Sequence, residues 1–592
     1  MILVALAFVG NEISNAESSD NWVGWANTAW KYFQPEIGVN SNTGLHYATS
    51  GWHRFTDWDL GVYIEAMIDA EKLGILGRDG TWGANYRLDK ILGFLESRQL
   101  SSDGLPFAQY DAETGHVPSD IGTRTAHPSD CGRLLLSLDD LRVFRPDLTA
   151  RIGSLVARHN FQALAESSYF AGNDIYPVYL AQGYHAFGFS TPRLRSVESL
   201  GGGSYVSVYG ESLPKAWVTT EPLLSAILEN RSVHVRYRTY SDRVFSAHQK
   251  RYEATGNLTA FSEGSYWGPY YYVYEWVVNA LGETWTVYAS EKIHAVPLVY
   301  SKIAFAFHAI YHNQYTNLLV SQLSPLQSSS PSGGYYEGKS EEGATLSVLS
   351  DKTNGMILAA ARYYLTHESQ PTFELSFQPS SLSVIKGGNS TLFVQLTPIG
   401  GFGDPVTLTV MDVPSGVSCQ LGQSQATPPA TVSLQVTASI EMSVGTYEIG
   451  VSGVSSSVSK QSLATLTIRS TTSTTIQLST HTANVSEAVE ILGSAQPPRT
   501  ATIVFLVSFN GSTWTPLTTV NSHENGTFRT EFSPLEPGAY MIKAQAAESE
   551  YYLSSESEPV TVTAVSEFSS VFVLAIALSV AVVSTTFLRE RS

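Results

Sequence analysis

The sequence contains few of the residues on which several common kinds of site depend. Only Cys131 and Cys419 occur among 592 residues, far apart and in segments of different composition, so we expect no disulfide framework. A metal site built on cysteine is excluded by number. The 14 histidines show neither an HExxH pattern nor paired metal-ligand spacing, and there is no nucleophile-elbow motif. The sequence therefore predicts no metal, no cofactor and no serine-type hydrolysis.

Basic residues are also scarce. Lys and Arg number 35 against 53 Asp and Glu, giving a net charge of −18. Binding to a phosphate backbone needs clustered Lys and Arg, so we expect no nucleic-acid partner. The chain also lacks a short fixed repeat, which a helical solenoid would require.

The two ends of the chain predict export and a membrane anchor. Residues 568–588 are 21 uncharged residues, enough to cross a bilayer as one helix, and Arg589 and Arg591 follow at once. Residues 1–16 resemble a signal peptide with a short apolar run, although no basic segment precedes it. We therefore expect a single-pass protein of the cell membrane, with its N-terminal bulk outside the cytoplasm and a cytoplasmic tail at 589–592.

Glycosylation sequons are weak support for the same location. Six Asn-x-Ser/Thr sequences occur, at Asn230, Asn257, Asn389, Asn484, Asn510 and Asn525.

The composition changes near residue 370, which marks a domain boundary. Before it, apolar residues recur at helical spacing in 60–70, 134–141, 223–228 and 303–310. Long loops rich in Gly, Pro, Tyr and Trp, such as 200–214 and 262–272, separate these helices and are expected to carry function. This pattern fits an all-α toroid of helical hairpins over residues 20–368, built around a central cleft.

After residue 370 the apolar period becomes two, as in 392–396, 406–410, 432–436 and 447–451, which indicates strands with one buried face. The sequences Gly445-Thr446-Tyr447 and Gly538-Ala539-Tyr540 each open such a run. We therefore predict two all-β immunoglobulin-like sandwiches, at 371–469 and 475–564, with the role of a stalk.

Short motifs in the helical part resemble, in order, a prokaryotic family catalogued as domain of unknown function 3131, which is related to six-hairpin glycosidases and glucoamylase-like enzymes. They are Thr43-Gly44-Leu45, Thr56-Asp57-Trp58-Asp59-Leu60-Gly61, Tyr110-Asp111-Ala112, Asp130-Cys131-Gly132-Arg133, Gly183-Tyr184, Val208-Tyr209-Gly210, Thr220-Glu221-Pro222, Arg251-Tyr252, Ala260-Phe261-Ser262-Glu263, Gly334-Tyr335-Tyr336-Glu337-Gly338 and Lys352-Thr353-Asn354. The resemblance implies a toroid fold and a glycosidase-like reaction class, without a known substrate. The sequence departs from the family pattern at Gly264, where an acidic residue is expected, and at Cys131, which replaces an aliphatic residue.

Hydrolysis of a glycosidic bond needs two carboxyl groups, one as acid and one as base or nucleophile. The candidates within the motifs are Glu221 and Glu263, followed by Asp59 and Glu337. Each has a structural alternative. Glu221 suits the first turn of a helix, Glu263 an exposed loop, Asp59 a helix cap and Glu337 a turn.

Sugar clefts combine aromatic platforms with polar side chains, and aromatic residues are frequent in the second half of the helical part. The candidates for substrate binding are Trp58, Asp111, Tyr209, Trp267, Tyr270 and Tyr336. Asp111 alternatively shapes an Asp-x-x-Thr-Gly turn, and many of the aromatic residues are expected in the core.

Three functions remain open from the sequence. The first is a glycoside hydrolase or transglycosidase acting on cell-envelope or environmental polysaccharide. The second is a carbohydrate-binding or surface-layer-associated protein that keeps the toroid without catalysis. The third is a polysaccharide lyase, which would need a Tyr or His base. The sequence leaves the sugar, the stereochemical outcome and the oligomeric state open.

Overall fold

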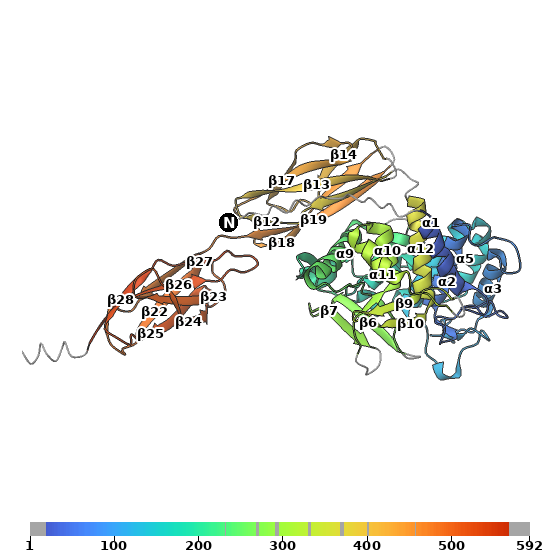
Figure 1. The fold of residues 1–592 in the computed structure, drawn as a ribbon, viewed down its shortest axis with the longest axis horizontal. Helices are drawn as coiled ribbons and strands as arrows, with labels where there is room; N and C mark the ends of the chain where they lie inside the picture. Colours follow the sequence, from blue (N-terminus) through green and yellow to red (C-terminus); the bar gives the residue numbers. More distant parts are fainter. Residues whose placement is uncertain are drawn as a thin grey trace, which may run out of the picture.

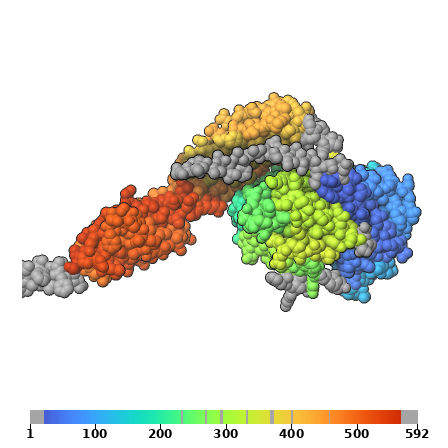
Figure 2. All heavy atoms as spheres, viewed as in Figure 1, coloured from blue at the N-terminus to red at the C-terminus, as the bar shows by residue number. Residues whose placement is uncertain are grey.

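The computed structural model describes residues 19–230, 233–267, 271–289, 295–329, 333–367, 372–399, 402–455 and 458–566. The expected signal-like segment at 1–16 and the expected membrane helix at 568–588 lie outside these residues. Within the described ranges, no helix has the length and apolar character that a membrane span needs. A helical part is followed by two β-rich parts, and the second of these extends away from the helices (Figures 1 and 2).

Six helices of the first part form a closed ring. Each packs against the next, and the last packs against the first; they are α2 (Asp57–Lys72), α4 (Pro128–Phe144), α7 (Tyr176–Ala186), α8 (Glu221–Glu229), α10 (Ser301–Tyr311) and α12 (Asp351–His367). Each ring helix carries an outer helix: α3 (Ala84–Ser97) on α2, α5 (Thr149–Ala157) on α4, α6 (Phe161–Ala165) on α7, α9 (Val235–Thr255) on α8, α11 (Gln314–Leu323) on α10 and α1 (Ser19–Trp30) on α12. This paired arrangement is a toroid of helical hairpins.

The ring helices are buried on most sides, which explains why their apolar residues dominate the sequence. The four apolar segments at 60–70, 134–141, 223–228 and 303–310 all lie in ring helices. Within α2 every residue from Asp57 to Ala70 is buried. The acids of this buried surface need partners: Asp57 is paired with Arg98, and both side chains are inaccessible to solvent.

The helical part also contains strands, so the prediction of an all-α toroid is wrong in this detail. Two three-stranded sheets border the ring: β5 (Glu263–Ser265), β6 (Tyr272–Val278) and β7 (Thr284–Ala289), and then β8 (Leu298–Tyr300), β9 (Tyr336–Ser340) and β10 (Thr345–Leu349). Two-stranded pairs join β1 (Arg54–Phe55) to β2 (Tyr110–Asp111) and β3 (Tyr205–Val208) to β4 (Glu211–Pro214). The Gly-rich and aromatic segments expected as loops therefore form hairpins that carry side chains toward the ring.

The first β-rich part packs two sheets around one core. One sheet has the order β11-β13-β17-β15 and the other β12-β19-β18-β14-β16. Their strands are β11 (Thr372–Gln378), β12 (Ser381–Ile385), β13 (Asn389–Ile399), β14 (Val406–Met411), β15 (Val417–Leu421), β16 (Gln425–Ala426), β17 (Ala430–Ala438), β18 (Gly445–Val454) and β19 (Ser459–Arg469). β12 runs parallel to β19, whereas the other pairs are antiparallel.

The second β-rich part repeats this plan. Its sheets are β20-β22-β25 and β21-β28-β26-β23-β24, with β27 on the edge of β26, and β21 is parallel to β28. The strands are β20 (Ser473–Leu478), β21 (Thr482–Asn484), β22 (Val489–Gln496), β23 (Thr502–Ser508), β24 (Thr515–Asn521), β25 (Thr527–Phe532), β26 (Gly538–Ala546), β27 (Ser555–Glu556) and β28 (Val560–Val565).

The two Gly-x-Tyr sequences occupy equivalent places in the two sandwiches. Gly445 and Gly538 begin β18 and β26 with φ of 153° and 155°. The hydroxyl groups of Tyr447 and Tyr540 donate to backbone carbonyls four residues upstream, at 3.0 Å and 2.8 Å. Such a tyrosine corner is a feature of immunoglobulin-like domains.

Ion pairs join the first sandwich to the helical part through α9. Arg236 and Arg243 both pair with Glu448 on β18, and Arg238 lies 3.7 Å from the Glu374 carboxylate on β11. Figure 1 shows β19 and its neighbours lying over α9. The sandwich is therefore docked on the outer face of the ring, and the cavity described below remains uncovered by it.

Candidate active site

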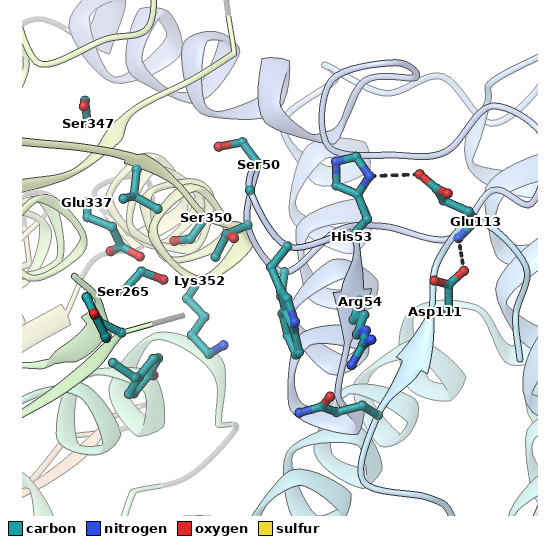
Figure 3. A pocket seen from close by; sticks show the side chains of 18 of the residues that line it. Ser50, His53, Arg54, Asp111, Glu113, Ser265, Glu337, Ser347, Ser350 and Lys352 are labelled. Atoms are coloured by element: carbon teal, nitrogen blue, oxygen red, sulfur yellow. Dashed lines mark hydrogen bonds and ion pairs between the residues drawn. The ribbon is translucent and has the colours of Figure 1, made fainter. Parts of the chain in front are cut away.

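An open cavity of about 1040 Å³ reaches into the helical part. Its lining includes Trp52, Arg54, Asp111, Tyr272, Glu337 and Lys352. In Figure 3, Glu337 and Lys352 lie on one side and His53, Arg54 and Asp111 on the other. The first group comes from β9 and the start of α12, and the second from the region of β1 and β2. The cavity therefore lies between the β1-β2 pair on one side and β9 with the start of α12 on the other.

The four candidate catalytic acids lie in one region with two lysines, and we call Asp59, Glu221, Glu263, Glu337, Lys302 and Lys352 the carboxyl cluster. Glu337 and Lys352 line the open cavity, and Glu221 and Lys352 line a small inner cavity of about 20 Å³. Lys352 thus lines both cavities. The sequence prediction placed these acids in one cleft. The structure brings them into one region, but Glu337 lines the open cavity, Glu221 lines the inner one, and Asp59 and Glu263 are in the lining of neither.

Glu263 is the first residue of β5 and is half-buried. The Tyr272 hydroxyl donates to its Oε1 at 3.2 Å. Burial raises the pKa of Glu263 to about 7, with the negative charge of Glu221 as the next contribution in the same direction. A carboxyl with this pKa holds a proton at neutral pH for part of the time, which is the property a general acid needs.

Glu221 begins α8 and is buried, with 3 % of its surface exposed. Its Oε2 accepts from the Ser262 hydroxyl at 2.8 Å and is ion-paired with the Lys302 ammonium. Lys302 is fully buried at the second position of α10, and it also donates to the backbone carbonyl of Glu263 at 2.7 Å. One ammonium group therefore ties the Glu221 side chain to the backbone of Glu263.

Glu337 and Asp59 differ in how many hydrogen bonds and ion pairs their carboxylates form. Glu337 Oε2 accepts from the Thr353 hydroxyl at 2.6 Å at the wall of the open cavity. Asp59 is the third residue of α2 and forms a capping box with Thr56, whose backbone N–H and hydroxyl donate to Oδ2 at 2.8 Å and 2.9 Å. Its Oδ1 is paired with Lys352. The cap predicted as the alternative role of Asp59 is therefore present.

The charge of Asp59 follows from these contacts. Burial acts to raise its pKa, but the Lys352 ammonium and its hydrogen bond outweigh burial, so the pKa lies below the ordinary value. Asp59 is thus a fixed carboxylate, better suited to holding Lys352 than to exchanging protons.

Gly264 leaves room for this arrangement. A Cβ atom there would lie 2.7 Å from Tyr300 Cε1 and 3.4 Å from Glu337 Oε2. The acidic residue that the family pattern suggests at this position would place a second carboxyl against Glu337. The glycine therefore preserves the space beside Glu337.

Sequence reasoning gave no catalytic or binding role to Asp130 or Tyr176. Asp130 lies in the first turn of α4, and burial, together with the charges of Asp59 and Asp57, raises its pKa to about 7. Tyr176 begins α7, and its buried hydroxyl has no hydrogen-bond partner among the described residues. After burial, the negative charges of Glu263 and Glu221 are the largest contributions that raise the Tyr176 pKa. The position of Asp130 in a family motif was the available signal for that residue, and Tyr176 had none.

Two of the expected substrate-binding residues line the cavities. Trp58 is 7 % exposed at the inner cavity, and its indole N–H is without a hydrogen-bond partner in the described part of the chain. Asp111 lines the open cavity, while its Oδ1 accepts from the backbone N–H groups of Glu113 and Thr114 at 3.0 Å and 2.9 Å (Figure 3). Asp111 therefore also has the turn-forming role that was its alternative.

The other expected binding residues lie elsewhere. Tyr209, with φ of 49°, lies in the turn between β3 and β4, its ring 6.2 Å from that of Trp285. Trp267 donates to the Thr345 carbonyl at 3.2 Å and so links the β5 region to β10. Tyr336 precedes Glu337 on β9 and therefore points to the opposite face of the strand. Tyr270 lies outside the described residues.

Within the described ranges, no group of three or more His, Cys, Asp or Glu side chains is arranged to hold a metal ion. The chemistry that the described side chains offer is proton transfer between carboxyl groups. Glu263 is able to hold a proton near neutral pH, and Glu221 is ion-paired beside it. This is the division of roles that cleavage of a glycosidic bond requires.

Comparison with known proteins supports a family assignment for the helical part. Residues 24–367 match a family described as "Protein of unknown function (DUF3131)". No curated protein matches the chain.

Solved structures with a related arrangement include an endo-beta-1,2-glucanase from Chitinophaga pinensis in complex with sophorotriose and glucose. It is 13 % identical, with a TM-score of 0.42, covering 59 % of this chain and 94 % of that one. A putative glucoamylase from Bacteroides caccae has 13 % identity and a TM-score of 0.43 with the same coverage. A putative glucoamylase from Bacteroides fragilis has 14 % identity and a TM-score of 0.42, covering 60 % of this chain and 94 % of that one.

Proposed function

This chain belongs to the DUF3131 family, and from the geometry of its site we propose that it is a glycoside hydrolase or transglycosidase acting on polysaccharide. One observation carries the proposal. Glu263 has a pKa raised to about 7 beside Glu221, and Glu221 is ion-paired with the buried Lys302. A carboxyl group that holds a proton near neutral pH can serve as acid, and a carboxylate paired with an ammonium group can serve as base or nucleophile.

In the proposed mechanism Glu263 donates its proton to the oxygen of the leaving sugar. Glu221 supplies the carboxylate, either by attacking the anomeric carbon or by activating a water molecule. Lys302 holds Glu221 in place through the ion pair and holds the backbone of Glu263 through its carbonyl. Glu337 and Lys352 line the entrance and are suited to hydrogen bonds with sugar hydroxyl groups.

The environment of the cleft tyrosines disfavours a polysaccharide lyase that uses a tyrosine base. Burial raises the pKa of Tyr274 to about 12, with Glu263 adding to the shift, and burial raises the pKa of Tyr272 well above its usual value. A lyase would need a tyrosine that gives up its proton more readily. Carboxylate chemistry is therefore better supported than elimination by a tyrosine base, while His53 at the open cavity is, among the described residues, the remaining candidate base for a lyase.

The direct test is hydrolysis of a panel of glucans and mannans by the full chain, measured as released reducing ends. We expect activity in the wild type and a loss on the order of 10² to 10⁴ in kcat in Glu263→Gln and in Glu221→Gln. Glu342→Gln, at an exposed turn between β9 and β10, is the control. Glycan binding without turnover in the wild type would favour a carbohydrate-binding protein instead. Full activity in Glu263→Gln would remove this residue from the mechanism.

We also propose that the protein is held at the outer surface of the cell membrane by residues 568–588. Their 21 uncharged residues and the basic residues that follow support this topology. Ending the chain at residue 566 should release the protein into the soluble fraction. If the shortened chain stays with the membranes, another part of the protein anchors it.

A further inference from the structure

Aromatic rings continue outward from the carboxyl cluster along one face of the β5-β6-β7 sheet. In the antiparallel register Glu263 lies opposite Tyr274, and Tyr274 lies opposite Tyr288. Directly opposed residues point to the same face of a sheet, so these three side chains form one row across three strands. The row begins at the proposed acid and ends at an exposed aromatic ring.

The same face carries further rings along β6. Tyr272 and Trp276 lie two residues on either side of Tyr274 and therefore share its face. The intervening Val273, Glu275 and Val277 are at most 1 % exposed and belong to the other, buried face. Strand alternation thus sorts the aromatic residues onto the side of Glu263.

Ring contacts make this surface continuous with the interior of the ring. The centroids of Trp58 and Tyr176 are 5.9 Å apart, and those of Tyr176 and Trp276 are 6.4 Å apart. Trp217 then lies 4.9 Å from Trp276 and 5.6 Å from Tyr288. We call Tyr176, Trp217, Tyr274, Trp276 and Tyr288 the aromatic track. It connects Trp58 at the inner cavity to rings at the surface.

The outer rings are accessible and at least one is fixed. Tyr274 and Tyr288 are 37 % and 41 % exposed. The buried Asn279 donates to the Tyr288 hydroxyl at 3.1 Å, which holds the ring in place. A platform that is already ordered loses little conformational entropy when a ligand stacks on it.

At the inner end the track offers unused hydrogen-bonding groups. The Tyr176 hydroxyl and the Trp58 indole N–H are both more than nine-tenths buried and have no partner among the described residues. An unpaired buried donor is costly, and a ligand hydroxyl is one group that can satisfy it. Trp58 lines the inner cavity together with Glu221. The negative charge of Glu221 also contributes to the raised pKa of Tyr176.

The described side chains on this face of β5 to β7 indicate the charge of the ligand. Besides Glu263 they are hydroxyl-bearing, aromatic or apolar, and these strands place no Lys or Arg there: Ser265, Tyr272, Tyr274, Trp276, Val278, Thr284, Thr286 and Tyr288. The ammonium group of Lys352, on α12, lies 6.0 Å from the centre of the Tyr272 ring, but it is paired with the Asp59 carboxylate. Aromatic faces pack well against the apolar faces of sugar rings, while an anionic chain would need cationic partners along its path. The face therefore suits an uncharged glycan.

We propose that the aromatic track is an extended set of binding subsites for a neutral polysaccharide, leading from Glu263 across the β5-β6-β7 sheet. This inference rests on the proposed function and assigns it a substrate class, an uncharged chain that spans several sugar units. β6 and β7 lie at the edge of the helical part opposite the first sandwich (Figure 1), so a long chain can leave the site without meeting the stalk.

The test compares glycans of increasing length, from disaccharides to octasaccharides of neutral glucan and mannan, with a polyuronate series as the charged counterpart. Binding is measured on full-length protein carrying Glu263→Gln, so that hydrolysis does not interfere. In this background we expect Tyr288→Ala and Trp217→Ala to weaken binding of the longest neutral chains on the order of 10-fold each, with disaccharide binding unchanged. Tyr288→Phe keeps the ring but loses the hydrogen bond from Asn279, and it should weaken binding less than Tyr288→Ala does.

Two matched controls separate the track from general effects. Leu281→Ala removes an exposed apolar side chain, 71 % accessible, from the turn between β6 and β7, and Phe509→Ala removes an exposed ring, 67 % accessible, from the second sandwich. Neither should change the affinity for any chain length. Thermal unfolding of every variant verifies that the fold is retained.

Three results would contradict the proposal. In the first, the Tyr288→Ala and Trp217→Ala proteins bind long chains with the same affinity as their Glu263→Gln parent. In the second, polyuronates bind more tightly than neutral chains, and in the third no neutral glycan binds. The two proposals can also fail separately. If the two variants lose length-dependent binding while the wild type releases no reducing ends, the binding subsites are supported and hydrolase activity is contradicted.

Discussion

Lys302 and Glu221 form an ion pair inside the helical ring, with 0 % and 3 % of their surfaces exposed. Replacing one partner leaves a buried charge without compensation. Lys302→Met should therefore lower the free energy of unfolding by about 3 to 5 kcal/mol, measured by denaturant titration. Combining it with Glu221→Gln removes both charges and should recover part of the loss. If the double variant is no more stable than Lys302→Met, the ion pair is not the cause.

The proposed acid gives the activity a defined pH dependence. Burial raises the pKa of Glu263 to about 7, and the residue acts only while it is protonated. Activity should therefore fall as the pH rises through about 7, measured as kcat/KM across the pH range. Lys302 is one of the charges that lower this pKa, so its loss in Lys302→Met should move the alkaline limb upward. An alkaline limb that stays in place in this variant would contradict the assignment.

Asp130 should make stability depend on pH in a way that one substitution removes. Its pKa is raised from 3.8 to about 7, with burial as the first cause. The folded state then holds a proton that the unfolded state has lost, so the contribution to stability is complete below 3.8 and disappears as the pH rises through about 7. Between pH 5 and pH 8 the wild type should therefore lose free energy of unfolding relative to Asp130→Asn, by an amount on the order of the free energy that corresponds to the pKa shift. Denaturation midpoints at the two pH values test this, and an unchanged difference would contradict it.

The buried ion pair of Asp57 and Arg98 should contribute far more to the free energy of unfolding than an ion pair at the surface does. Both side chains of this pair are 0 % exposed, and Arg98 donates to both carboxylate oxygens. Asp57→Ala should cost about 3 to 5 kcal/mol of stability, because it leaves the guanidinium buried and unpaired. The control is Asp89→Ala, whose carboxylate is 74 % exposed beside Arg151. That change should cost less than about 1 kcal/mol. Similar losses in the two variants would contradict the argument from burial.

Gly264 should be intolerant of a side chain. A Cβ atom there lies 2.7 Å from Tyr300 Cε1, so Gly264→Ala must displace the ring or the strand. We expect a loss of about 1 to 3 kcal/mol together with reduced activity, because Glu337 borders the same space. Gly24→Ala on α1 is the control, since nothing lies within 4 Å of the added atom. This exposed helical position should tolerate alanine or gain slightly from it. Wild-type stability and activity in Gly264→Ala would contradict the close contact.

The large-scale fold could be predicted because its elements differ in period and burial. Ring helices such as α2 are buried on nearly all sides, so their apolar residues are dense enough to recognise. The strands of the sandwiches bury one face and alternate regularly. The hairpin of β6 and β7 was missed because its alternation involves Tyr and Trp, in surroundings rich in Gly and Pro that resemble a loop. Only the fold brings this hairpin against α7.

The site was predicted in part for a similar reason. Glu221 and Glu263 belong to short motifs and could be chosen as candidates, and the structure brings them together. Lys302 could not be found, because a single lysine at the start of an apolar helix carries no local sign that it will be fully buried. Tyr176 could not be found either, because its proposed role depends on neighbours that lie on other helices and strands. The catalytic roles of all four candidate acids stay predictions.

The ion pairs between α9 and the first sandwich also bear on how the protein behaves under mechanical load. Glu448 lies on β18, which pairs along its length with β19. β19 ends at Arg469, and this residue binds Glu548 at 2.5 Å and the Ser549 carbonyl at 2.9 Å in the second sandwich. The ion pairs of Glu448 with α9 and the contacts of Arg469 with the second sandwich therefore lie on neighbouring strands of one sheet. Under tension on the second sandwich, these side-chain contacts would have to break before the sandwiches could separate from each other and from α9.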